Sequence, residues 1–219
     1  MNKIFTTLLV LLISTSLFSQ EPKDKKAEEI LNKLSEKAKT YNTIEATFTF
    51  TQEDLKADDV SNQDGAVKVE GEKFALTLGD YQIFNDGTIT WTFDSEMNEA
   101  TKDLTEEVQD PDSPTFSEML TMWEKGFKYK FDSEETIDGK VYQIINLYPE
   151  KGEEKTYHTA KLTIDKSKLE IYKIVLLGKD GINYTYTIKS FNVNIDFSSE
   201  TFTFDPSKHS GCEVIDNVL

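Results

Sequence analysis

The sequence predicts a mainly β protein with two helical elements, built as one curved antiparallel sheet or barrel of about ten or eleven strands. Apolar and polar residues alternate with a period of two, as around Phe48 and Phe50, and this pattern recurs along the chain. Hairpin turns containing Asp-Gly pairs separate these runs, for example at 86–87 and 138–139. Helical periodicity interrupts the strands before the first of them and again near mid-chain. A sheet that curls around two apolar helices encloses apolar volume.

The first residues have the pattern of an export signal. A basic start is followed by an apolar run at 8–13, and Ser19-Gln20 offers a small-residue cleavage point. The apolar run is too short to favour a membrane-spanning helix. We therefore expect residues 1–19 to be a cleaved signal peptide, residues 20–219 to form a single domain, and the mature protein to be exported. An uncleaved membrane anchor is the alternative.

The chain is strongly acidic, with a formal net charge of -16, and it contains no Arg. Arg is the residue that binds phosphate and carboxylate groups in a bidentate manner. This charge balance argues against a nucleic-acid partner and against docking on an anionic membrane surface. Cys212 is the single cysteine, so an internal disulfide is excluded and packing must stabilise the fold.

The first half of the chain is expected to contain a helix followed by an antiparallel meander. Asp24 is a suitable N-cap, and the apolar face of the helix that follows consists of Ala27, Ile30, Leu31, Leu34, Ala38 and Tyr41. A strand with Phe48 and Phe50 comes next, and the meander occupies 65–94. The polar, acidic segment 55–64 is expected to be a loop, and 99–113 has the same polar, acidic character.

The second half is expected to begin with a helix and to continue with strands. Ser113-Pro114 is a typical helix start and Gly126 a typical helix end. Met119 and Met122 on this helix suit a surface that repacks around different ligands. The strands that follow are predicted at 127–131, 141–148, 157–164, 169–177 and 182–191, with one or two short final strands within 197–204 and 212–218.

Several short motifs follow one another in a characteristic order. They are the helix opening at 27–31, the segment 41–52 that ends in Thr-Gln, the glycine, alternating strand and Lys-Phe at 65–74, the hairpin at 82–87 followed by Trp91, the Phe-Thr-Phe-Asp-Pro at 202–206, and the closing segment 211–216. Together, their order and spacing resemble the LolA family of periplasmic carriers of outer-membrane lipoproteins. The resemblance covers nearly the whole mature chain.

The resemblance implies an unclosed β half-barrel with an α-helical lid over an apolar cavity that takes acyl chains. It implies that the protein receives acylated lipoproteins from an inner-membrane ABC-type exporter and passes them to an outer-membrane acceptor, whose identity it leaves open. It involves no covalent chemistry and no cofactor. With the export signal, the resemblance implies that the mature protein is periplasmic, and we expect a monomeric carrier and not an enzyme.

One feature departs from the family's pattern. Well-studied members close the lid with an arginine near the early strands, and this chain has no arginine. Within the corresponding stretch 67–73, Lys68 or Lys73 is the candidate for a looser latch, or the latch is absent.

The expected binding residues lie on apolar positions of the early strands and of the lid. The cavity is expected to be lined by Phe48, Phe50, Val67, Val69, Phe74, Leu76, Ile83, Trp91 and Phe93. The lid residues are expected to be Ile30, Leu34, Phe116, Met119, Leu120 and Trp123. Ordinary core packing is the alternative for each of these side chains. The choice of inward face depends on polarity alone, and a shift of one residue would reverse a strand.

Catalytic and metal-binding motifs do not stand out. His158 and His209 lie far apart without ligand-like neighbours, and the acidic stretch 54–64 lacks the EF-hand pattern. There is no nucleophile elbow, phosphate loop or dinucleotide fingerprint. Besides the lipoprotein carrier, two functions stay open: an envelope lipid-binding protein with a glycolipid or fatty acid as cargo, and a protein-interaction module that uses the apolar groove. An enzyme such as an esterase is the remaining alternative, and it would require a well-formed catalytic triad in the structure.

Overall fold

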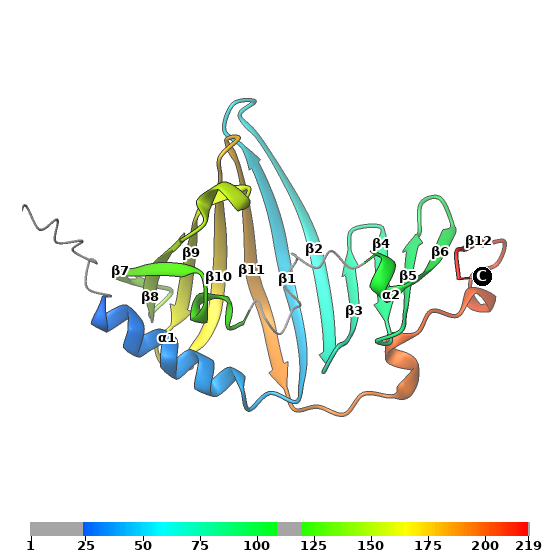
Figure 1. Cartoon of the computed structure of the whole chain (residues 1–219), viewed down its shortest axis with the longest axis horizontal. Helices are drawn as coiled ribbons and strands as arrows, with labels where there is room; N and C mark the ends of the chain where they lie inside the picture. Colours follow the sequence, from blue (N-terminus) through cyan, green and yellow to red (C-terminus); the bar gives the residue numbers. More distant parts are fainter. Residues whose placement is uncertain (1–23, 109–119, 219) are drawn as a thin grey trace, which may run out of the picture.

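The computed structural model describes residues 24–108 and 120–218, and most of them lie in strands (Figure 1). The strands are β1 (Thr43–Asp54), β2 (Asp59–Glu70), β3 (Lys73–Leu78), β4 (Tyr81–Asn85), β5 (Ile89–Asp94), β6 (Glu99–Leu104), β7 (Phe127–Ile137), β8 (Lys140–Pro149), β9 (Tyr157–Asp165), β10 (Glu170–Gly178), β11 (Ile182–Val193) and β12 (Glu213–Asp216). The α-helices are α1 (Lys25–Ala38) and α2 (Thr105–Val108). Short 3-10 turns are η1 (Met122–Glu124), η2 (Gly152–Glu154), η3 (Ser199–Phe202) and η4 (Pro206–Lys208).

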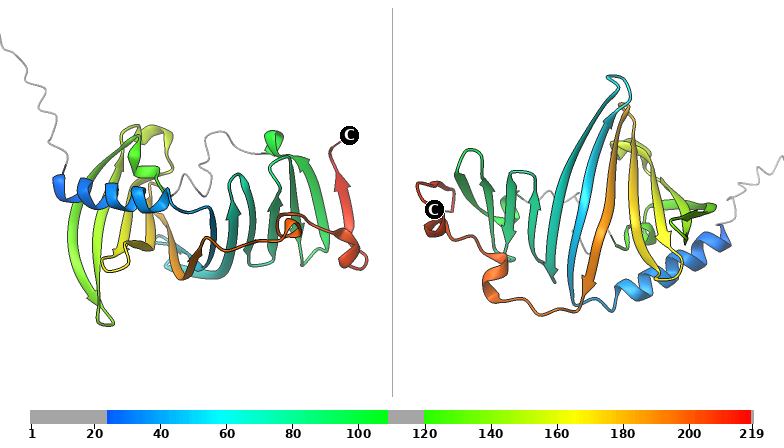
Figure 2. Two further views of the ribbon diagram at one scale, coloured as in Figure 1. Left: turned by 90° about the horizontal axis from the view of Figure 1, so that it is seen from below. Right: turned by 180° about the vertical axis from the view of Figure 1, so that it is seen from behind.

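The twelve strands form one sheet with the order β12-β6-β5-β4-β3-β2-β1-β11-β10-β9-β8-β7. Neighbouring strands are antiparallel except β12 and β6, which are parallel. Among the described residues the end strands β12 and β7 do not pair with each other, so the sheet is unclosed. This confirms the predicted fold class, with the final strand added in parallel. Figure 2 shows α1 lying across the yellow and green strands, while the orange C-terminal segment continues toward β12.

Helix α1 begins at the residue that the sequence predicts. Asp24 has an extended backbone, and its Oδ1 accepts hydrogen bonds from the N–H groups of Lys26 and Ala27 at 3.0 and 3.1 Å. These bonds satisfy donors that the first helical turn leaves free. Its Oδ2 accepts a further bond from the N–H of Phe131 on β7 at 2.9 Å. The cap of the helix therefore also fixes the helix to an edge strand of the sheet.

Hairpin turns connect the strands where the sequence predicts them. Asp138 and Gly139 both have positive φ, at 50° and 77°, and they alone separate β7 from β8. A two-residue turn of this handedness matches the twist of the strands that it joins, and Asp-Gly adopts it readily. The turns at 86–88 and 179–181 likewise join β4 to β5 and β10 to β11.

The apolar interior is divided into three clusters. The first packs α1 against β7–β10 and includes Leu31, Leu162 and Ile164. The second lies on β1 and β2 around Phe48. We call the sheet face that carries Phe48 the cavity face, and the opposite one the outer face. The third cluster is centred on Phe93.

The cavity face changes from apolar to polar toward β6. Leu76 on β3 pairs with Ile83 on β4, but the next partners on this face, Thr92 on β5 and Thr101 on β6, are threonines. Cross-strand partners share a face, so this part of the cavity face carries polar side chains. The buried Asn85 on the same face donates hydrogen bonds to the hydroxyls of two further threonines.

Phe84 of β4 and the apolar side chains of β5 and β6 lie instead on the outer face, where the C-terminal segment covers Phe84, Trp91 and Phe93. Phe84 pairs with Trp91, and the ring of Phe204 lies 4.9 Å from that of Phe93. The His209 ring also packs on Phe93, with centroids 4.4 Å apart. The sheet therefore buries opposite faces in its two halves.

Three element predictions are wrong in part. Residues 59–64, expected in a loop, belong to β2, because they pair with β1 although their side chains are exposed. Residues 197–204, expected as a strand, contain η3 and pack through Phe202 and Phe204. The first half of the mid-chain helix predicted from Ser113 lies outside the described residues, and its last part contains η1. Among the described residues, no helix has the length and apolar character needed to cross a membrane.

Candidate functional site

An apolar cavity lies between the C-terminal end of α1 and the cavity face of the central strands. Its empty space is about 1110 Å³, part of which is open to solvent. Its lining is almost entirely apolar, which suits an apolar ligand. The cavity is lined by Leu34, Ala38, Tyr41, Phe48, Leu76, Leu78, Leu120, Glu170, Ile171, Ile174, Tyr186, Ile188 and Phe191.

The floor of the cavity is formed by strands that are distant in sequence. Phe48 on β1 is paired with Ile188 on β11, and Ile174 on β10 is paired with Tyr186, which also lies on β11. A bulge between Ser190 and Ile188 shifts the register by one residue. Because of this shift the apolar pattern of β11 stays on the cavity face over its whole length.

The roof is formed by the end of α1 and by the segment that follows residue 119. Leu34 and Ala38 face the cavity from the helix, and Leu120 faces it from the segment. Trp123 anchors this segment, since its Nε1–H donates a hydrogen bond of 2.9 Å to the hydroxyl of the buried Ser35. The indole is 3% exposed, so the hydrogen bond is shielded from water.

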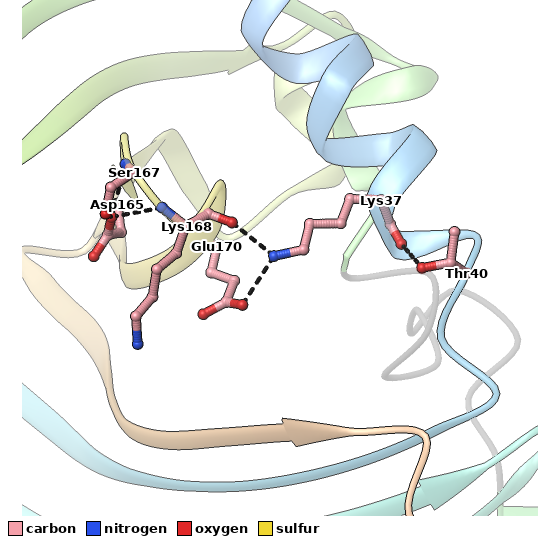
Figure 3. A network of polar contacts seen from close by, with 6 residues as sticks. All are labelled: Lys37, Thr40, Asp165, Ser167, Lys168 and Glu170. Atoms are coloured by element: carbon pink, nitrogen blue, oxygen red, sulfur yellow. Dashed lines mark hydrogen bonds and ion pairs between the residues drawn. The ribbon is translucent and has the colours of Figure 1, made fainter.

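A polar network ties the same helix end to the rim of the cavity (Figure 3). The Nζ of Lys37 donates to Glu170 Oε1 at 2.9 Å and to the carbonyl of Lys168 at 2.6 Å. Asp165 shapes the turn before β10, because its Oδ1 accepts from Ser167 and from the N–H of Lys168. Burial opposes ionisation of Asp165, but these hydrogen bonds outweigh it and lower its pKa. The rim thus presents its hydrogen-bond acceptors to Lys37 from a rigid turn.

The electrostatics of the lining are those of an apolar compartment with few polar groups. Burial raises the pKa of the Tyr41 and Tyr186 hydroxyls, so both stay neutral well above pH 7. Glu170, the charged residue of the lining, is engaged by Lys37. Such a site binds an apolar chain by the hydrophobic effect and leaves polar contacts to its rim. In the described part of the chain, no group of three or more His, Cys, Asp or Glu side chains is placed to hold a metal ion.

The predicted site residues divide into several groups. Phe48, Leu76, Leu34 and Leu120 line the cavity. Others lie on the cavity face beside it, namely Phe50, Val67, Val69, Phe74 and Ile83. Ile30 and Trp123 are buried in the first cluster, between α1 and β7–β10. Phe116 and Met119 lie outside the described residues.

Two of the predicted lining residues, Trp91 and Phe93, lie on the opposite side of the sheet. Their register with β4 and β6 places them on the outer face, where Phe204 packs against both. Threonines alternate with apolar residues on β5, and this alternation by itself predicts that Trp91 and Phe93 face the cavity. The covering segment comes from the C-terminus, more than 100 positions away, which local polarity does not reveal.

Sequence reasoning missed the lining residues from β10 and β11. These residues alternate with a period near two, interrupted by bulges, which is the pattern of a strand with one apolar face. They are Ile171, Ile174, Tyr186, Ile188 and Phe191. Their place at the cavity depends on the pairing of β1 with β11. That pairing is non-local, so the alternation alone does not indicate it.

The lysines proposed as a latch are not at the lid. The ammonium of Lys68 lies 3.7 Å from Glu45 on the neighbouring strand, and both residues are on the outer face. Lys73 alternates with Phe74 and therefore lies on the outer face as well. The ion pair that connects helix to sheet at the cavity is Lys37 with Glu170.

An unclosed curved sheet, a helix across one of its faces and an apolar cavity between them define a class of carrier folds. The model of one such family, described as outer membrane lipoprotein carrier protein LolA, matches residues 39–205. This match covers well over half of the chain. The chain belongs to the LolA family.

Comparisons with individual proteins show further similarity in sequence and in fold. An uncharacterized protein of Methanocaldococcus jannaschii is 23% identical over 207 residues, covering 94% of this chain and 59% of that protein. The chain thus spans less than two thirds of this curated relative. The structure of LprF from Mycobacterium bovis has a TM-score of 0.52 at 12% identity, over 80% of this chain and 97% of that chain. An uncharacterized conserved protein from Thermus thermophilus gives 0.54 at 12% identity, over 88% and 99%. These two structures share the fold.

Proposed function

We propose that this protein is a periplasmic carrier that binds the acyl chains of lipoproteins in its cavity and transports them from the inner to the outer membrane. The observation that carries the proposal is the apolar cavity between α1 and the sheet, in a chain of the LolA family. The proposed partners are acylated lipoproteins and an inner-membrane ABC-type exporter. The proposed location rests on the signal-like pattern of residues 1–19 together with membership of a family of outer-membrane lipoprotein carriers.

Elementary energetics explain why such a carrier is needed. Moving a methylene from an apolar environment into water costs roughly 0.8 kcal/mol, so a chain of about sixteen carbons costs on the order of 12 kcal/mol. A lipoprotein with several chains therefore does not cross an aqueous compartment unaided. A cavity covered by the end of a helix shields the chains, and the polar contacts of Lys37 that hold this end can be exchanged for water when the chains are released.

The proposal is tested by identifying what the protein carries in its own cells. The protein is purified from the periplasm and analysed by native mass spectrometry, and bound molecules are extracted into organic solvent. We expect a triacylated lipoprotein, or a lipid that a synthetic lipopeptide displaces. A glycolipid or a free fatty acid that a lipopeptide does not displace contradicts the lipoprotein cargo and supports a different envelope lipid.

A pair of variants assigns the bound molecule to the cavity. Ala38→Trp fills the cavity from the roof, because Ala38 is part of the lining. Glu36→Trp places the same side chain on the exposed side of the same helix. We expect the first variant to lose the bound lipid and the second to retain it. Absence of lipid from the wild-type protein, together with failure to take up a fluorescent lipid, would overturn the proposal in favour of a protein-binding groove.

A further inference from the structure

Gly65 lies directly beneath one of the aromatic rings of the cavity floor. It is the cross-strand partner of Phe48, on β2 opposite β1. A Cβ atom built on Gly65 would lie 2.4 Å from Phe48 Cζ and 2.6 Å from Cε2. Real side chains do not approach so closely. The ring of Phe48 is therefore folded down onto the backbone of Gly65, in the space that any other residue would fill.

Space, and not backbone conformation, explains the glycine at this position. Gly65 is not among the glycines with positive φ, so an L-residue is compatible with its backbone. Glycine weakens a strand interior, and it often marks a point where another group approaches the backbone closely. Here that group is a ring that belongs to the cavity lining.

Residues of β11 flank the Phe48 ring. Ile188 is its partner on β11, on the side away from Gly65. The Tyr186 ring is 6.1 Å away, measured between centroids. A side chain at position 65 would occupy the space under the Phe48 ring, and Ile188 and Tyr186 lie beside the ring on β11. The ring would then rise into the cavity and reduce its depth.

We infer that Gly65 sets the depth of the cavity and thereby the length of the acyl chain that the protein accepts. This inference rests on the proposed function, because it concerns the ligand of the same cavity. Phe48 is part of the cavity floor, and the absence of a side chain at Gly65 lets its ring lie low in that floor.

The inference is tested by measuring how affinity depends on chain length. Saturated fatty acids of increasing length compete with a fluorescent fatty acid for the delipidated full-length protein. In the wild type, affinity should rise roughly fourfold per methylene until the chain exceeds the cavity, and then level off. In Gly65→Ala the levelling should occur at a shorter chain, with weaker binding of all longer ones.

Two further variants distinguish lost depth from a damaged fold. Phe48→Leu lowers the floor and should move the levelling point to a longer chain. The double variant with both substitutions should return toward the wild-type profile, since leucine leaves room for the alanine Cβ. Gly152→Ala is the matched control: its backbone φ is also not positive, and an added Cβ there meets no atom within 4 Å. Thermal unfolding confirms that each variant is folded.

The outcomes separate this inference from the proposed function. A wild type that binds chains, combined with unchanged levelling points in both Gly65→Ala and Phe48→Leu, overturns the role of Gly65 alone. If Gly65→Ala does not fold, the shift in Phe48→Leu decides the question. A wild type that binds no chain of any length overturns the proposed function and the inference together.

Discussion

The carboxylate of Glu134 on β7 joins three parts of the molecule. It accepts a hydrogen bond of 2.8 Å from Lys166 in the turn after β9 and one of 3.1 Å from Gln143 on β8. Lys26 on α1 lies 3.5 Å away. The hydrogen bond from Lys166, followed by that from Gln143, lowers the pKa of Glu134 from 4.5 to about 2. The ionised carboxylate therefore links the helix to the sheet through its ion pairs with Lys26 and Lys166.

We predict that Glu134→Gln removes part of the acid sensitivity of the fold. A carboxylate whose pKa is lowered by folding stabilises the protein above pH 4.5, and this stabilisation is lost as the pH falls toward 2. Thermal midpoints measured between pH 7 and pH 2 should decrease more in the wild type than in the variant. Glu29→Gln, on the exposed side of α1, is the control and should follow the wild type. Parallel curves for Glu134→Gln and the wild type would contradict the prediction.

At the scale of elements, α1 is attached to the sheet differently at its two ends. Its start is fixed by the Asp24 cap and its hydrogen bond to Phe131 on β7. Its last turns depend on the hydrogen bond between Trp123 and Ser35 and on the contacts of Lys37 with the turn before β10. The side chains of Lys37 and Glu170 are 33% and 26% exposed, so water competes for both. The end of the helix that covers the cavity is thus held in part by an ion pair that water can reach.

We predict that Lys37→Met loosens this end of the helix and accelerates ligand entry. Loss of the ion pair and of the hydrogen bond to the Lys168 carbonyl should cost about 1 kcal/mol, which lowers the thermal midpoint by about 2–4 °C. Stopped-flow uptake of a fluorescent fatty acid should become faster.

Lys33→Met provides the comparison for this variant. Lys33 pairs with Glu29 within the helix and has no contact with the rim of the cavity. The Lys33→Met variant should take up the fluorescent fatty acid at the same rate as the wild type. Equal rates in all three proteins would show that the polar contacts of Lys37 do not limit access.

The elements themselves follow closely from the sequence. The α1 cap, the hairpins at Asp86-Gly87 and Asp138-Gly139 and the strands of the second half agree with their local patterns. The failures are segments in which tertiary contacts override polarity. Residues 59–64 are polar but pair with β1 along a long hairpin arm. Phe202 and Phe204 look like strand positions but are buried as anchors of a covering segment.

At the scale of the whole molecule, the sheet buries its cavity face in one half and its outer face in the other. The change from one buried face to the other occurs at β4, where Ile83 lies on the cavity face and the adjacent Phe84 on the outer face. The outer face of β4–β6 is covered by the C-terminal segment through Phe204 and His209. The aromatic residues that seal the outer face are therefore not those that line the cavity.

We predict that Phe93→Ala destabilises the protein without changing its ligand. Phe93 is 3% exposed, and truncating a buried phenylalanine typically costs about 3–5 kcal/mol. Urea denaturation should show this loss, while the folded variant keeps the wild-type affinity for a fluorescent fatty acid. Leu76→Ala, in the cavity lining, should weaken that affinity. A folded Phe93→Ala variant with weakened affinity would argue against the separation of the two faces.

The sequence by itself determined the fold class, the turns, the first helix and the apolar alternation of nearly every strand, because these depend on residues close together along the chain. The tertiary structure alone decided which apolar face encloses the cavity. That choice depends on the pairing of β1 with β11 and on the C-terminal segment that covers Phe93, both contacts between residues more than 100 positions apart. Alternation specifies that a strand has two different faces, but only its partners in space determine which of them is turned toward the cavity.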